Sequence, residues 1–136
     1  MRIDELELKR LHDHAIEGYP HEVCGVLAGD RQTGEVRKVQ ALVNERADSP
    51  HNRYRVGGLT LMRAERDLEA QGLEIVGYYH SHPDHPADYS DTDRDNALPN
   101  MSYLITAIHQ GAVADTKVWR LRDDRSAMDP EALESP

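Results

Sequence analysis

The sequence predicts an α+β protein, or an irregular α/β sandwich, in which helices pack on a mixed β-sheet. Two segments predict amphipathic helices, because their apolar residues form one stripe and charged residues cover the rest of the surface. Several short runs rich in β-branched and aromatic residues predict strands, and two pairs of these runs are joined by short turns, as in hairpins. In chain order the prediction is a helix, two strands, an edge strand, a helix, a strand, a short helix and two strands.

Local signals set the bounds of each predicted element. The first helix is predicted over residues 4–18 and ends at Gly18 and Pro20, which do not continue a helix well. The second helix is predicted over residues 59–71, with Gly72 as its C-terminal cap. Strands are predicted over residues 22–29, 35–43, 53–56 (a short edge strand), 73–82, 101–109 and 113–121.

The 136 residues are expected to form one domain. A chain of this length buries roughly two-thirds of its unfolded surface, which is enough for a hydrophobic core. Residues 1–121 contain all the predicted helices and strands. Residues 122–136 are charged and poor in apolar side chains, which predicts a polar C-terminal tail that is loosely held.

Composition and charge argue against several classes of function. A net charge of −9 does not suit nucleic-acid binding, which needs clustered lysine and arginine. No apolar run approaches the ~18 residues of a membrane span, and the first residues hold no apolar signal core. The single cysteine cannot form an intramolecular disulfide and suits a reducing compartment. The chain is therefore expected to work in the cytoplasm, without a membrane or nucleic-acid partner.

The segment from His80 to Asp93 concentrates the metal-binding and acid–base side chains of the chain. His80 and His82 end a predicted strand and project to one face of it, because side chains alternate with period two. Pro83 cannot donate to a sheet ladder, so the strand should stop there with the pair at its exposed end. Asp93 could return as an oxygen ligand. Two imidazoles and a carboxylate fill three positions of a tetrahedral zinc ion and leave the fourth to water, as in catalytic sites.

The same residues also allow plainer interpretations. Ser90 and Asp93 resemble a capping box that starts a helix running to about Leu98. This interpretation is compatible with metal binding, because a capped helix start is a rigid place to mount a ligand. Taken without Asp93, His80 and His82 could simply be polar residues at a strand end.

Glu22 and Cys24 lie on one face of the strand predicted over residues 22–29. Glu22 could be a solvated charge at the strand start, or the general base that a zinc-activated water requires. Cys24 could be a fourth zinc ligand, although a buried free cysteine more often acts as a small apolar residue.

The spacing of these residues resembles the signature of the JAMM (MPN+) metalloprotease family. That signature is a Glu, then His-Ser/Thr-His, seven residues, Ser, two residues and Asp. The matching residues here are Glu22, His80, Ser81, His82, Ser90 and Asp93. The resemblance covers the chain from the first helix to the strand that ends near Leu121.

The resemblance implies a fold and a role for each matching residue. The fold would be a curved mixed sheet flanked by helices, related to cytidine deaminases. Glu22 would activate the water and protonate the leaving amine, Ser90 would hydrogen-bond the oxyanion or orient the water, and Ser81 would point away from the metal and hold the loop. One catalytic zinc ion would be bound by His80, His82 and Asp93.

The resemblance also implies a reaction. The family hydrolyses peptide or isopeptide bonds at the tails of ubiquitin-like proteins, and this chain is similar to its short bacterial and archaeal members, which are linked to ubiquitin-like or sulfur-carrier proteins. A non-catalytic MPN scaffold is the alternative, but such members typically lose the ligand set. A zinc deaminase would need a Cys-x-x-Cys pair, which one cysteine cannot supply. Three residues of the intervening loop are expected to be solvated: Asp84, His85 and Asp88.

Overall fold

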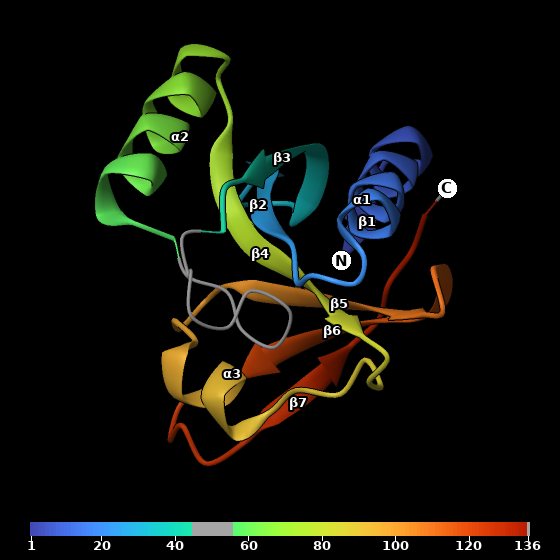
Figure 1. Ribbon diagram of the computed structural model, residues 1–136. Coiled ribbons are helices and arrows are strands. Elements are labelled where there is room, and N and C mark those ends of the chain that lie inside the picture. The colour runs from blue at the N-terminus through green and yellow to red at the C-terminus, as the bar shows by residue number, and fades with distance from the viewer. Residues whose placement is uncertain (45–55, 136) are drawn as a thin grey trace.

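The computed structural model describes residues 1–44 and 56–135. The described residues form one seven-stranded mixed sheet in the order β1-β3-β2-β4-β5-β6-β7, and the sheet is strongly curved (Figure 1). Pairs β1/β3 and β4/β5 are parallel, and the other neighbouring pairs are antiparallel. The elements are β1 (Arg2–Ile3), α1 (Glu5–Gly18), β2 (Cys24–Asp30), β3 (Glu35–Leu42), α2 (Gly58–Ala70), β4 (Glu74–Pro83), α3 (Asp91–Asn96), β5 (Ser102–His109), β6 (Ala112–Leu121) and β7 (Met128–Glu131). The predicted α+β class, with helices on a mixed sheet, is confirmed.

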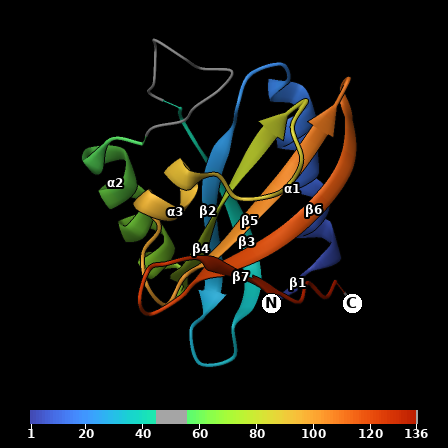
Figure 2. The ribbon, with the colours of Figure 1, turned by 90° about the horizontal axis from the view of Figure 1, so that it is seen from below.

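Helices α1 and α2 cover opposite faces of the central strands (Figures 1 and 2). Leu27 of β2 belongs to the core cluster that contains Leu11 of α1, whereas Val26 belongs to the cluster that contains Leu68 of α2. Successive side chains of a strand point to opposite faces, so a strand covered on both sides is apolar throughout. This explains why β2 and β4 read as continuous apolar runs rather than as alternating ones.

One prediction about the end of the chain is wrong, and one short strand near its start was not predicted. The tail predicted over residues 122–136 is not loose throughout, because β7 pairs with β6 and Met128 is buried beside Leu121. An edge strand needs a buried side chain on one face only, so a charged segment can supply it. Strand β1 was not expected, since two residues carry no periodic signal.

The edge strand predicted over residues 53–56 lies, apart from Val56, outside the described residues.

Among the described helices, none combines the length and the apolar character that a membrane-spanning helix requires.

The close approach of β4 to β5 gives a test of the fold. A Cβ atom on Gly77 would collide with the backbone carbonyl of Ser102 on the paired strand. Because backbone cannot move aside as a flexible side chain can, Gly77→Ala should lower the free energy of unfolding by about 1–3 kcal/mol. Urea denaturation of Gly58→Ala is the matched control, since a Cβ there meets nothing within 4 Å. Equal stability of the two variants would contradict the pairing of β4 with β5.

Candidate metal centre and active site

The last residues of β4 hold two imidazoles on one face of the sheet. Strand β4 pairs with β2 on one side and β5 on the other, and it ends at Pro83. His80 is 1% exposed, whereas His82 lies closer to the surface. Their Nε2 atoms are 3.1 Å apart. The predicted placement of a histidine pair on one face at the end of a strand is thus what the structure has.

Asp93 reaches the same place from α3. Its Oδ1 lies 3.2 Å from Nε2 of His80, and its Oδ2 lies 3.4 Å from Nε2 of His82. The capping box is also present, because the Asp93 amide donates to Ser90 Oγ (3.0 Å) and the Ser90 amide donates to Asp93 Oδ2 (2.8 Å). The two interpretations of this segment therefore hold together: the cap fixes the carboxylate that faces the histidines.

The spacing of these three groups fits a tetrahedral metal ion. Bonds of 2.0–2.1 Å from nitrogen and oxygen to a tetrahedral ion place the ligand atoms about 3.3 Å apart. The two Nε2 atoms are 3.1 Å apart, and each has one oxygen of the Asp93 carboxylate near this distance, Oδ1 at 3.2 Å from His80 and Oδ2 at 3.4 Å from His82. Nδ1 of His82 donates to the Pro86 carbonyl at 2.8 Å, since a carbonyl can only accept. In the neutral ring this leaves the lone pair on Nε2, facing the centre, as a metal ligand requires.

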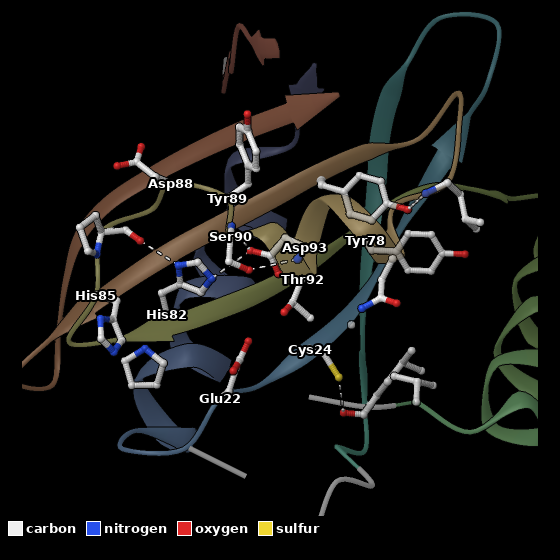
Figure 3. Close-up of a pocket in the computed structure, with 18 of the residues that line it drawn as sticks. Glu22, Cys24, Tyr78, His82, His85, Asp88, Tyr89, Ser90, Thr92 and Asp93 are labelled. Atoms are coloured by element: carbon white, nitrogen blue, oxygen red, sulfur yellow. Dashed lines mark hydrogen bonds and ion pairs between the residues drawn. The ribbon is translucent and has the colours of Figure 1, made fainter. Parts of the chain in front are cut away.

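Glu22 provides a second carboxylate beside the histidines. It lies just before β2, is 6% exposed, and its carboxylate approaches His82 from a different element than Asp93 does (Figure 3). One ligand atom from each of Glu22, His80 and His82 fits within a 4.8 Å span, so this trio could also hold a metal. We favour Asp93 as the third ligand, because its oxygens lie 3.2–3.4 Å from the imidazole nitrogens.

Backbone pairing fixes the segment that carries Glu22. The amide of Val23 donates to the Ser81 hydroxyl at 2.9 Å, and the Ser81 amide donates to the Val23 carbonyl at 3.0 Å. The side chain of Ser81 therefore points away from the imidazoles and ties β4 to the Glu22 segment, as the resemblance implied. Asn44 donates to the Glu22 carbonyl at 3.0 Å.

The two carboxylates differ in pKa because their surroundings differ. Burial raises the pKa of Glu22 to about 7, against the opposing effect of His82. Burial would also raise the pKa of Asp93, but hydrogen bonds from His80 and His82 outweigh it and hold that pKa far below its usual range. Burial lowers the pKa of His80, which favours the neutral ring that can bind a metal. The site thus contains one carboxylate that stays ionised and one that can exchange a proton near neutral pH.

A pocket of about 920 Å³ opens beside these groups (Figure 3). The candidate residues Glu22, His82, Ser90 and Asp93 line one part of it. The remainder is largely apolar and includes Cys24, Gly25, Leu42, Val56, Leu61, Tyr78, Leu98 and Tyr103. The pocket could therefore accommodate an extended chain with its reacting bond at the polar end.

Cys24 lies in the wall of this pocket rather than among the metal ligands. Its side chain is buried, and Sγ lies 3.9 Å from the carbonyl oxygen of Leu42. This supports its interpretation as a small apolar residue over that as a fourth ligand.

The loop between β4 and α3 is more constrained than a solvated loop. Asp84 accepts from the Tyr19 hydroxyl at 2.7 Å and from the Gln110 amide at 2.9 Å, and Asp88 pairs with Lys117 at 2.8 Å. Both aspartates are exposed as expected, but their partners come from distant parts of the chain. His85 is exposed and lines the pocket. Sequence reasoning also missed the Pro86 carbonyl, because a backbone acceptor carries no residue-type signal.

The curved mixed sheet, with its histidine pair at the end of a central strand, defines a JAB1/MPN-type domain. A JAB1/MPN domain protein from Archaeoglobus fulgidus superposes with a TM-score of 0.62 at 17% identity, over 99% of this chain and 98% of that one. The family model of prokaryotic homologs of the JAB domain matches residues 6–122. The chain therefore belongs to the prokaryotic JAB family, which confirms the JAMM resemblance.

Two named relatives also match the chain. A desampylase from Haloferax volcanii is 38% identical over 97 residues, which span 68% of this chain and 69% of the relative. A probable TtuB-protein conjugate cleaving protease from Thermus thermophilus is 36% identical over 98 residues, which span 72% of this chain and 64% of the relative.

The geometry predicts that a divalent metal ion stabilises the protein. A metal concentration 100-fold above the dissociation constant should raise the free energy of unfolding by about 2.7 kcal/mol, because only the folded state assembles the ligands. His82→Ala removes one ligand and should abolish most of this rise. Denaturation of both proteins with and without metal measures the difference. The same metal-dependent rise in His82→Ala would exclude His82 from the centre.

Proposed function

We propose that this protein is a zinc-dependent metallopeptidase that cleaves the peptide or isopeptide bond at the C-terminal tail of a ubiquitin-like or sulfur-carrier protein. The observation that carries the proposal is the convergence of His80, His82 and Asp93, with Glu22 beside them at the end of a large pocket. The names of the two relatives support the substrate class, since both refer to cleavage of protein conjugates or modifiers.

The proposed metal ligands are His80, His82 and Asp93, and the proposed ion is zinc. A donor set of two neutral imidazoles and a carboxylate suits zinc, although the same set suits other divalent first-row metals. When bound, the ion would lower the pKa of a coordinated water towards about 7 and polarise the scissile carbonyl. The pocket is lined by His82 and Asp93 themselves, so a coordinated water would be open to a substrate in that pocket.

Glu22 is the proposed general base and, later, general acid. It is buried among ligands of the proposed ion, and its pKa of about 7 lets it accept a proton from water and then give it to the departing amine. A neighbouring cation would favour the ionised form and move that pKa downwards. Asp93 cannot share this role, because its pKa is held far too low.

Ser90 is proposed to stabilise the oxyanion or orient the water. Its Oγ accepts a hydrogen bond from the Asp93 amide, and a hydroxyl can donate its own hydrogen at the same time. The capping geometry fixes the oxygen next to a proposed ligand. This supports a role in which the Ser90 hydroxyl donates to the carbonyl oxygen of the substrate as negative charge develops on it.

The pocket suits a flexible tail as the substrate. A tail rich in glycine can lie extended along a sheet and bring its last carbonyl to a centre that a folded segment could not enter. We further propose that the protein works in the cytoplasm on protein substrates, without a nucleic-acid or membrane partner. A non-catalytic MPN scaffold is the alternative, and the retained set of Glu22, His80, His82, Ser90 and Asp93 argues against it.

Glu22→Gln tests the chemical role directly. The amide keeps the shape of the side chain but cannot take a proton, so turnover should fall by about 10²–10⁴-fold while metal content and thermal stability stay close to wild type. Single-turnover cleavage and elemental analysis of the same preparation measure the two properties. Wild-type turnover in the variant would mean that Glu22 is not the base.

Cleavage of defined substrates tests the reaction. Zinc-loaded protein is incubated with a ubiquitin-like protein and a sulfur-carrier protein, each joined to lysine through an isopeptide bond or extended by a peptide at its C-terminus. Intact-mass analysis should show two products, the modifier and the released lysine or peptide. Their summed mass should exceed the mass of the substrate by one water. Products that also form after chelation of the metal, or intact substrates in every reaction, would contradict the proposal.

A further inference from the structure

The loop of residues 84–90, between β4 and α3, touches a proposed metal ligand at each end. Near its start, the Pro86 carbonyl accepts the Nδ1 hydrogen of His82 at 2.8 Å (Figure 3). At its end, Ser90 forms the capping box with Asp93. The position of this loop therefore sets both the ring orientation of His82 and the position of the Asp93 carboxylate.

Strand β6 holds the three residues between these two ends. The indole Nε1 of Trp119 donates to the Ala87 carbonyl at 3.0 Å. The Trp119 ring meets the Tyr89 ring edge-on, with 5.0 Å between ring centroids. Lys117 pairs with Asp88 at 2.8 Å. Ala87 itself is 1% exposed, so its carbonyl is held in a packed environment rather than in solvent.

We propose that Trp119 is a positioning residue that sets the metal affinity of the centre without touching it. This inference rests on the metal site proposed above. The carbonyls of Pro86 and Ala87 belong to consecutive peptide groups, so fixing one restricts rotation of the other. Losing the indole hydrogen bond would let the Pro86 carbonyl turn, and His82 would lose both its tautomer and its ring orientation. Partners of metal ligands typically change metal affinity by 10–100-fold.

The indole hydrogen bond fixes the position of the loop more strongly than the neighbouring ion pair does. Lys117 and Asp88 are 41% and 58% exposed, and an exposed pair contributes little. Trp119 is partly buried and is a donor only, so its N–H has a strong requirement for an acceptor at this place. The aromatic contact with Tyr89 holds the indole against the loop.

Trp119→Phe is the test variant, because it removes the indole N–H and keeps a smaller aromatic ring on the side that faces Tyr89. Its dissociation constant for Zn²⁺, measured by competition with a chromogenic chelator, should be at least about tenfold larger than that of wild type. Thr116→Val is the matched control on the same strand. It removes hydrogen bonds to His12 and Thr106 on the other face of the sheet, so it should lower stability without changing Zn²⁺ affinity.

Thermal unfolding of both metal-free variants separates positioning from general weakening. If Trp119→Phe binds Zn²⁺ as tightly as wild type, or if Thr116→Val weakens Zn²⁺ binding equally, Trp119 has no specific role in positioning the ligands. If wild type itself binds no metal, the proposed function fails first. If wild type binds and cleaves while Trp119→Phe keeps full affinity, only the positioning role fails.

A second measurement needs no variant. Coupling between two sites is reciprocal, so if the indole hydrogen bond favours the metal, the metal must protect that hydrogen bond. The chain has one tryptophan, so its indole N–H gives a single assignable NMR signal. Exchange of this proton with solvent should slow by about tenfold when Zn²⁺ is added, matching the expected effect on affinity. An exchange rate that does not change with Zn²⁺ would overturn the proposal.

Discussion

Strand β4 is the constraint on which the site depends. It is hydrogen-bonded to β2 and β5, and near its start Val76 packs in the core cluster of α1 and Ile75 in that of α2, so its last residues cannot take another register. A shift of one residue would turn both imidazoles away from the pocket and bring Ser81 and Tyr79 into it. The ladder that stabilises the core therefore also sets where the histidine nitrogens lie.

The remaining groups are built around the end of this strand by short local interactions. A helix cap delivers Asp93, a backbone carbonyl orients His82, and the serine between the histidines holds the Glu22 segment. Each of these interactions is a hydrogen bond of ordinary length, and none requires strain at the ligands. The two carboxylates then have opposite properties, because burial raises the pKa of Glu22 to about 7, whereas hydrogen bonds from His80 and His82 keep Asp93 ionised.

Much of the core fold and the residues of the candidate site could be predicted from the sequence. The histidine spacing and the capping motif are local signals, and both survive in the structure because strand and helix periodicity fix them. What failed depends on contacts between distant residues. Met128 of β7 is buried in a cluster with Ala97 and Tyr103, and Trp119 contacts Ala87 across 32 positions of the chain. Neither contact leaves a pattern in either segment alone.

The identity of the third ligand is the central claim, because Asp93 and Glu22 both lie next to the histidine pair. Anomalous diffraction from crystals of the zinc-loaded protein tests it most directly. We expect one zinc ion bound by Nε2 of His80, Nε2 of His82 and a carboxylate oxygen of Asp93, with the Glu22 carboxylate outside bonding distance. Zinc bound by Glu22 in place of Asp93 would remove the general base and contradict the account.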